Sequence, residues 1–208
     1  GSGSGGAVLA NRLTESPSVS VLLIEAGPDF PSFELMPDEL KYSYTNYAFR
    51  KNATFDWGYS GTASSKKQTM MVPRARVIGG CTSHNGPGPN FYRGAPEDYD
   101  SWASSGNTEW SFDKVLPYFI KLETQKDISS EYHGTDGPVQ VRRHKQKDWS
   151  AFQTAGFQAM LALGFPEHPD VNHPEYTGAA PRTENNIDGV RQSTLLCYIN
   201  PIRERQNL

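Results

Sequence analysis

A run of four glycines and two serines opens the sequence, Gly1-Ser2-Gly3-Ser4-Gly5-Gly6, in the pattern Gly-x-Gly-x-x-Gly. Residues 7–15 follow with helical periodicity and stop at Ser16-Pro17. Residues 21–24 then form an apolar segment, expected to be a strand, that runs directly into Glu25. A glycine turn, a helix, a strand and an acid in this order and spacing are typical of an α/β fold that binds a dinucleotide at the glycine turn.

Each glycine has its own physical role in such a turn. Gly1 permits the tight turn, Gly3 lets the backbone approach a pyrophosphate, and Gly6 lets the following helix pack close to the sheet. The helix N-terminus directs free N–H groups and a partial positive charge at the phosphates. We expect Glu25 to accept hydrogen bonds from the adenosine ribose. The alternative, that the run is a cloning linker, is disfavoured because the helix and the apolar segment follow in register.

The two ends of the sequence read as cut. A glycine turn of this kind needs a strand before it, yet Gly1 is the first residue. At the other end, Leu208 comes directly after residues 193–205, which read as a final helix that Pro201 should kink or break. We therefore expect the chain to be a piece of a longer protein, truncated at both ends.

Composition excludes several classes of protein. The formal net charge of −3 argues against nucleic acid as the main partner. With 36% hydrophobic residues and a mean hydropathy of −0.62, no segment is long and apolar enough to span a membrane. The two cysteines, Cys81 and Cys197, are too few for a disulfide framework. Four of the five histidines, His133, His144, His168 and His173, are not spaced as a metal site, so we expect them at ordinary turn or surface positions and expect no metal.

The rest of the chain alternates irregular and regular segments. Residues 28–72 are rich in Pro, Tyr and polar residues and are expected to be a long loop, braced by an aromatic cluster around Trp57 and Tyr59. A helix is expected from Ser111 to about residue 122, a strand over residues 139–142, and an amphipathic helix over residues 151–163.

A second glycine run lies in the middle of the chain and narrows the interpretation. It reads Pro73-Arg74-Ala75-Arg76-Val77-Ile78-Gly79-Gly80-Cys81-Thr82-Ser83-His84-Asn85-Gly86. Together with the opening run, the Leu23-Ile24-Glu25-Ala26-Gly27 block, Arg93-Gly94, Asp98-Tyr99-Asp100-Ser101-Trp102, His133-Gly134, Gly137-Pro138, Arg191-Gln192-Ser193 and Asn207-Leu208, it resembles the glucose–methanol–choline (GMC) family of flavin oxidoreductases. These ordered blocks cover nearly the whole chain.

The resemblance implies a fold, a cofactor and an activity. The fold is α/β, with a Rossmann-like FAD-binding domain and an interleaved substrate domain. The boundaries implied are an FAD-binding domain over residues 1–142, with a lid-like loop at 28–72; the start of the substrate domain at 143–187; and a return to the FAD-binding domain at 188–208. The enzyme would be an FAD-dependent alcohol oxidase or dehydrogenase that passes hydride from the alcohol to flavin N5.

The resemblance also implies which residues bind the cofactor: Gly1, Gly3, Ser4, Gly5, Gly6, Glu25, Ala26, Arg76, Val77, Gly79, Gly80, Cys81, His84, Asn85 and Gly86. Within the family, the Gly-Gly-Cys-Thr-Ser-His-Asn run is similar to the choline oxidase branch, in which the matching histidine is bonded to the flavin. We therefore expect His84 to be attached covalently to FAD. The run Gly86-Pro87-Gly88-Pro89-Asn90 departs from that branch, so the match does not carry choline specificity across.

No catalytic residue is assigned to this chain, because the family's catalytic histidine lies near its C-terminus, beyond Leu208. We expect the piece alone to be inactive, the substrate to be a small-molecule alcohol and the location to be cytoplasmic, and the oligomeric state stays open. The alternatives are a non-redox flavoprotein of the same type (a lyase or a photodecarboxylase), a non-catalytic truncated piece, and an NAD-dependent dehydrogenase. The residues around His84 disfavour the last, since a nicotinamide site does not need them.

Overall fold

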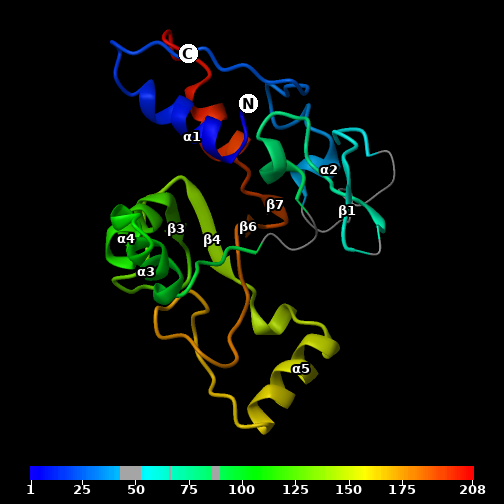
Figure 1. Ribbon diagram of the computed structural model, residues 1–208, viewed down its shortest axis with the longest axis vertical. Coiled ribbons are helices and arrows are strands. Elements are labelled where there is room, and N and C mark those ends of the chain that lie inside the picture. The colour runs from blue at the N-terminus through cyan, green and yellow to red at the C-terminus, as the bar shows by residue number, and fades with distance from the viewer. Residues whose placement is uncertain (43–52, 66, 86–89) are drawn as a thin grey trace. The chain divides into compact units, whose positions relative to one another are not determined.

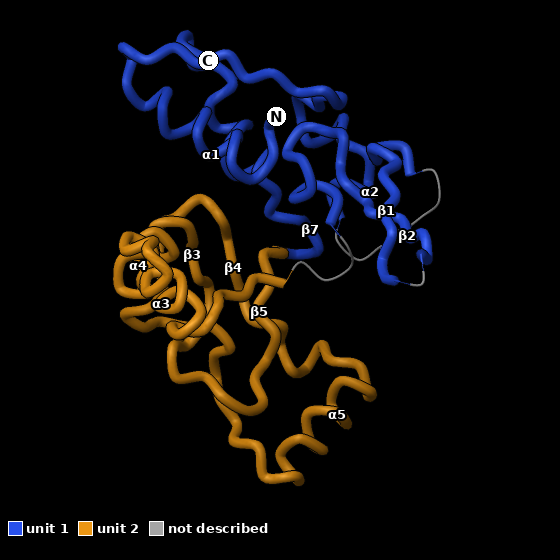
Figure 2. The backbone as a smooth tube through the Cα atoms, viewed as in Figure 1, with its two compact units in different colours: residues 1–89, 188–208 blue, residues 90–187 orange. Residues whose placement is uncertain are grey.

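The computed structural model describes residues 1–42, 53–65, 67–85 and 90–208 (Figure 1). The chain forms two compact units, and the first is discontinuous in sequence (Figure 2). Unit 1 comprises residues 1–89 and 188–208, and unit 2 comprises residues 90–187. The mixed α/β class expected from the sequence is confirmed. The units divide the chain by compactness alone, so the expected division into FAD-binding and substrate domains stays a prediction.

Unit 1 is built around helix α1 (Ser4–Leu13), which buries Ala7 and Ala10. Its partner is the final part of the chain, where η5 (Leu195–Ile199) is a π-helical turn and η6 (Asn200–Ile202) is a 3-10 turn. The side-chain amide of Asn11 donates to the Tyr198 carbonyl at 2.8 Å, which fixes the two segments to each other. The helix expected over residues 193–205 is therefore replaced by these two shorter helical turns, and the break expected at Pro201 is confirmed. Pro201 cannot donate to an α-helical ladder, and the backbone changes its winding there.

Residues 21–25 carry no regular secondary structure, so the expected strand is wrong for the described chain. A strand needs hydrogen bonds from a neighbouring segment, and Val21 N–H, which donates to the Asn207 carbonyl at 2.8 Å, makes the one such backbone bond of residues 21–25 within the described ranges. Leu22 and Ile24, which alternate with half-buried residues, are 85% and 69% exposed. One face of this apolar segment, the face that carries Leu22 and Ile24, is therefore exposed to solvent.

The expected loop over residues 28–72 contains short regular elements in its described part. These are α2 (Asp38–Lys41) and the antiparallel pair β1 (Ser60–Thr62) and β2 (Thr69–Met71). Leu40 of α2 is almost fully buried and belongs to the core of unit 1. Strand β7 (Val190–Arg191) packs beside α2 and pairs through Val190 with Tyr42. A lid-like role for this region stays a prediction.

Unit 2 carries three helices and a small sheet. The helices are α3 (Pro96–Ser104), α4 (Phe112–Leu122) and α5 (Ala151–Ala162), with the 3-10 turns η3 (Thr108–Trp110) and η4 (Gln146–Asp148). Strand β4 (Val139–Arg143) is central: it pairs in parallel with β3 (Glu123–Gln125) and antiparallel with β5 (Thr183–Glu184). A last short strand, β6 (Asn186–Ile187), ends the unit.

The expected elements of unit 2 are confirmed in type, with small changes of boundary. The apolar spacing of α5 does not correspond to a buried face, because Phe157 is the one buried residue of this helix and Phe152 is 88% exposed. The helix after Ser111 begins at Phe112, whose N–H is held by Asp100 Oδ1 at 2.9 Å. The helix after Ser150 has a capping box, because Ser150 Oγ accepts from Gln153 N–H at 3.2 Å and Gln153 Oε1 accepts from Ser150 N–H at 2.9 Å. The described part of the chain has no helix of the length and apolarity that a bilayer crossing requires.

Candidate functional site

The opening glycine turn is tied to Glu25 through Ser2. The Ser2 backbone N–H and its hydroxyl both donate to Glu25 Oε2 at 2.8 Å, and Gly27 N–H donates to Oε1 at 2.9 Å. Burial by itself would raise the pKa of Glu25, but the hydrogen bonds from Ser2 and Gly27 outweigh it and hold that pKa below its ordinary value. Glu25 is therefore an ionised carboxylate in a fixed orientation at neutral pH.

The second glycine run meets the first one directly. Gly79 and Gly80 have φ angles of +82° and +57°, in the left-handed region that side chains rarely adopt. Gly79 N–H donates to the Ser2 hydroxyl at 3.0 Å. A Cβ atom on Gly80 would lie 2.7 Å from Gly3 Cα, closer than real contacts allow. The approach of the two backbones thus depends on glycine at residue 80.

A cavity of about 590 Å³ opens where these segments meet. Its lining residues are Gly1, Gly3, Ser4, Ile24, Glu25, Ala26, Trp57, Tyr59, Arg74, Ala75, Gly80 and Cys81. The N-terminus of α1 begins at Ser4 in this lining, with no side-chain cap and no acidic residue in its first turn. Its free N–H groups are therefore available to an anionic ligand, and the cavity combines them with the fixed carboxylate of Glu25.

Two aromatic rings form one side of this cavity. The rings of Trp57 and Tyr59 are stacked, with centroids 6.0 Å apart and planes inclined by 1°. The guanidinium carbon of Arg76 lies 5.6 Å from the centre of the Trp57 ring. The aromatic cluster expected around Trp57 and Tyr59 is present, and it faces the cavity instead of bracing a loop alone. Such a surface suits a planar ligand group.

His84 follows the 3-10 turn η2 (Gly80–Ser83) and is only 3% exposed. Burial lowers its pKa, and the positive charge of Arg191 lowers it further, while Asp56 acts in the opposite direction. The ring is therefore neutral at physiological pH, and one of its nitrogens carries a lone pair. It is not among the residues that line the cavity.

The loop from Gly79 to Asn85 is fastened by the segment that follows unit 2. Thr194 N–H donates to Thr82 Oγ1 at 2.9 Å, and the Thr194 hydroxyl donates to the Gly79 carbonyl at 3.1 Å. At the far end of the loop, the Arg191 guanidinium donates to the Asn85 side-chain oxygen. Both ends of the loop are thereby held by residues more than one hundred positions further along the chain.

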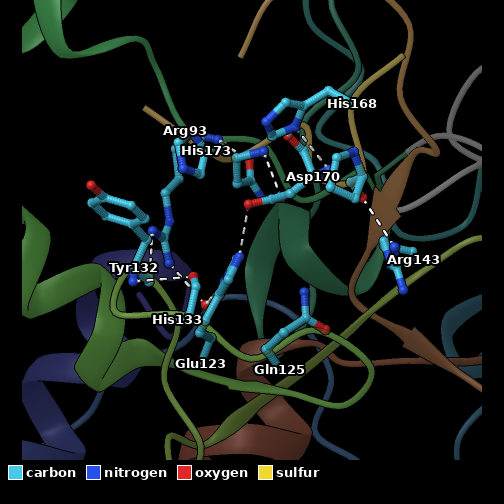
Figure 3. A network of polar contacts seen from close by, with 12 residues as sticks. Arg93, Glu123, Gln125, Tyr132, His133, Arg143, His168, Asp170 and His173 are labelled. Atoms are coloured by element: carbon cyan, nitrogen blue, oxygen red, sulfur yellow. Dashed lines mark hydrogen bonds and ion pairs between the residues drawn. The ribbon is translucent and has the colours of Figure 1, made fainter. Parts of the chain in front are cut away.

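Unit 2 contains a separate buried network of charged residues (Figure 3). Glu123 Oε1 accepts from the Arg93 guanidinium at 2.8 Å and lies 2.6 Å from His133 Nδ1. On the other side of the ring, His133 Nε2 lies 2.9 Å from Asp170 Oδ2. Burial works to lower the pKa of His133, but the hydrogen bonds to Asp170 and Glu123 outweigh it and raise the pKa to about 9.

This network corrects the expectation that His133 is an ordinary turn or surface residue. The His133 side chain is 1% exposed and the Glu123 side chain is fully buried. A protonated imidazole between two carboxylates is stable there because each ring N–H has an acceptor. None of these residues lines the cavity described above. The network is therefore a structural element that ties together the segments of unit 2 that carry Arg93, Glu123, His133 and Asp170.

Comparisons of the sequence with known proteins show which family the chain belongs to. The family model described as GMC oxidoreductase matches residues 5–208. The chain belongs to the GMC oxidoreductase family. Among curated GMC relatives, an uncharacterised GMC-type oxidoreductase of Rhodococcus erythropolis is 34% identical over 208 residues, and the oxygen-dependent choline dehydrogenase of Brucella melitensis is 34% identical over 213 residues. Each match covers the whole of this chain but only 41% and 37% of the relative, respectively.

Solved structures of GMC-type enzymes show the same fold. Pyridoxine 4-oxidase from Mesorbium loti superposes with a TM-score of 0.88 at 29% identity, covering the whole chain and 40% of that protein. An FAD-dependent oxidoreductase from Chaetomium thermophilum gives 0.84 at 28% identity, over the whole chain and 36% of that protein. The chain therefore spans about two fifths of the length of the GMC proteins it matches.

The residues of this GMC chain that were predicted from the sequence to bind the cofactor differ in their exposure. Seven of them, Gly1, Gly3, Ser4, Glu25, Ala26, Gly80 and Cys81, line the cavity. Gly5 borders open space, and a Cβ on Gly6 would overlap the Gly1 carbonyl. Val77, Gly79 and His84 are buried, Arg76 and Asn85 are exposed, and Gly86 lies outside the described residues.

Sequence reasoning missed three residues of this site: Ser2, Arg191 and Thr194. Ser2 stood at a variable position of the glycine pattern, and Arg191 served only as one residue of a family block. Each acts through a partner that lies far away along the chain, at separations of 23, 106 and 112 residues. No local pattern of residues reports such a contact, although two glycine runs in one chain are a signal that their flanking residues can meet.

Proposed function

We propose that this chain forms the FAD-binding part of an oxidoreductase that oxidises a small-molecule alcohol to a carbonyl compound. The observation that carries the proposal is the cavity in which both glycine runs, the start of α1 and the ionised Glu25 meet. A dinucleotide has a pyrophosphate that needs N–H donors and a ribose that needs an acceptor. The residues present fit both needs.

The binding roles follow from the chemistry of each residue. Gly3 and the first turn of α1 would hold the pyrophosphate, since their backbone approaches without a Cβ in the way. Glu25 would accept a hydrogen bond from a ribose hydroxyl through Oε1, because that oxygen accepts only from Gly27 N–H while Oε2 already accepts twice from Ser2. The loop at residues 79–85 would contact the flavin end of the cofactor.

Bound FAD would supply the hydride acceptor of the reaction. The alcohol loses a hydride from carbon and a proton from oxygen, and a carbonyl compound results. We assign no catalytic base among the residues of this chain, so its own contribution is to bind the cofactor, orient it and exclude water from it. The named relatives act on choline, pyridoxine and, in a formate oxidase from Aspergillus oryzae, formate. Because formate is not an alcohol, these names do not fix one substrate, and we propose a primary alcohol as the substrate class.

We further propose that His84 is the point of covalent attachment to the flavin. A nucleophilic imidazole must be neutral, and burial together with Arg191 keeps it so. The Thr82–Thr194 contact and the Asn85–Arg191 bond hold the residues on either side of it. The non-redox alternatives have no specific observation in their favour here.

The test is the identity and behaviour of the cofactor in the full-length natural protein that carries this chain. The purified protein is expected to show flavin absorbance, to contain FAD after digestion, and to lose that absorbance when primary alcohols are added without oxygen. A colourless protein that carries NAD would contradict the proposal. A flavin-loaded protein that no alcohol reduces would support FAD binding but contradict the activity.

A further inference from the structure

Arg191 on β7 is a buried cation without a counter-ion in the described chain. It is 1% exposed and is the largest of the fully buried side chains. Within the described ranges no carboxylate lies close enough to form an ion pair with it, and its Nε atom has no hydrogen-bond partner. Burial lowers its pKa to about 10, so the guanidinium is still charged at neutral pH. Burying an unpaired charge is unfavourable, and such a group calls for a reason.

Anchoring alone does not supply that reason. Arg191 donates one hydrogen bond, from Nη1 to the Asn85 side-chain oxygen. Thr194, three residues later on the same segment, fastens the loop with three contacts that involve no net charge. Neutral contacts like those of Thr194 fasten the loop without the cost of a buried charge. The charge itself must therefore matter to what the loop does.

The surroundings of the loop show where that charge acts. The Arg191 charge works against protonation of His84, while Asp56 favours it. The partner of Arg191, Asn85, is the residue next to His84 in sequence. The cation is thus held beside the loop at which the proposed flavin ring would lie, in a place that water does not reach.

We propose that Arg191 is a positioning residue of the cofactor site: it orients Asn85 and holds a buried positive charge that favours the reduced, anionic form of the flavin. This inference rests on the proposed function. Oxidised flavin is neutral. When it accepts a hydride from the alcohol carbon, while the alcohol proton passes to a base, it takes up two electrons and one negative charge. A buried cation without a partner gains a counter-charge in that step, which stabilises the product.

The experiment measures the midpoint reduction potential of the flavin in the purified full-length protein by equilibration with a reference dye. Arg191→Met removes the charge, Arg191→Gln keeps a donor for Asn85 without the charge, and Arg191→Lys keeps the charge. Thr194→Val is the matched control, since it loosens the same loop and leaves every charge in place. Thermal midpoints of all four variants measure the structural cost separately.

We expect Arg191→Met and Arg191→Gln to shift the potential to more negative values, so that the ratio of reduced to oxidised flavin at a fixed potential falls roughly tenfold. Arg191→Lys is expected to retain most of the wild-type value, and Thr194→Val to lower the thermal midpoint without this shift. If Arg191→Met does not fold, Arg191→Gln decides the question. In the flavin-free protein, the His84 imidazole is expected to titrate at higher pH in both neutral variants.

An unchanged potential in Arg191→Gln, or an equal shift in Thr194→Val, would overturn the inference while leaving FAD binding intact. A wild-type protein that holds no flavin would instead contradict the proposed function. In that case the His84 titration in the protein without flavin still tests whether the Arg191 charge acts at this loop, and an unmoved titration would reject it.

Discussion

The hydroxyl of Ser2 donates a 2.8 Å hydrogen bond to the carboxylate of Glu25, and the oxygen of that hydroxyl also accepts a hydrogen bond from the N–H of Gly79. One fully buried side chain thereby joins the two glycine runs and the acid that together define the cavity. A hydroxyl suits this place because it can donate and accept at once.

Replacing Ser2 with Ala is expected to leave the buried N–H of Gly79 without an acceptor and to remove one of the donors to Glu25. We expect the free energy of unfolding to fall by about 1–3 kcal/mol and the affinity for FAD to fall with it. Denaturant unfolding and FAD titration measure the two effects. Ser16→Ala, which removes an exposed hydroxyl, is the control; an equal loss in both variants would count against the role of Ser2.

Replacing Glu25 with Ala is expected to weaken FAD binding by roughly 1.5–3 kcal/mol, because charge-assisted hydrogen bonds to the ribose are lost. The affinity for free ADP should fall in parallel, while riboflavin, which lacks the adenosine ribose, should bind as before. Isothermal titration of each ligand gives the comparison. The exposed Glu97→Ala serves as control, and an unchanged ADP affinity in the Glu25 variant would contradict the assignment.

Gly80 and Gly58 offer a matched pair for the contact between the glycine runs. Both have positive φ, +57° and +71°, but a Cβ on Gly58 meets nothing within 4 Å, whereas one on Gly80 would press on Gly3 Cα. Gly58→Ala should cost about 1–2 kcal/mol of stability from backbone strain alone. Gly80→Ala should cost more and should also lower the fraction of purified protein that carries flavin, because the Cβ would press on the glycine turn expected to bind the pyrophosphate. If chemical denaturation gave equal losses of stability for the two variants, the contact between the glycine runs would tolerate a Cβ atom at residue 80, and the prediction would be wrong.

Covalent attachment at His84 is tested by acid precipitation followed by mass spectrometry of the 77–93 peptide. We expect the yellow colour to stay with the pellet and the His84 peptide to be heavier by one flavin. His84→Asn should lose the bond but keep FAD, because the pyrophosphate and ribose contacts come from other residues. Release of all the FAD from the wild-type protein would reject the bond and leave His84 as a neighbour of the flavin.

Because His133 is protonated in its buried network, we expect the free energy of unfolding to fall as the pH becomes alkaline. The folded-state pKa of His133, about 9, lies above the ordinary 6.5, so its contribution is fully present below about pH 6.5 and is lost as pH rises through 9. The free energy of unfolding should fall by up to about 3 kcal/mol over that window. In His133→Gln this dependence should disappear. A wild-type profile that stays flat from pH 6.5 to 9.5 would contradict a protonated imidazole.

Sequence spacing was enough to predict the glycine turn and Glu25, because a turn, a helix and an acid follow one another within 25 residues. It was also enough for the position of β4, from its alternation, and for that of α5, from the spacing of its apolar residues. It failed for residues 21–25, since a strand exists only with a neighbour, and an apolar pattern does not reveal whether one is present. The family resemblance supplied the cofactor, which local pattern alone left open.

Long-range contacts account for the rest. His133 looked ordinary because its two acceptors, Glu123 and Asp170, lie ten residues before it and 37 after it. Arg191 and Thr194 act on a loop more than one hundred residues earlier. Burial of this kind is a property of the packed chain, and neither charge pattern nor periodicity encodes it within a single segment.

Because unit 1 is discontinuous in sequence, its two parts are synthesised at different times. The loop at residues 79–85 leaves the exit tunnel early, but Thr194, which fastens it, is synthesised only after all of unit 2. At roughly 5–20 residues per second, the second glycine run waits about 5–20 seconds for that partner. Unit 2 can fold in the interval, whereas the loop at residues 79–85 stays unfastened. A nascent chain stalled before residue 191 would therefore lack both anchors of this loop, Arg191 and Thr194, however long the stall lasts.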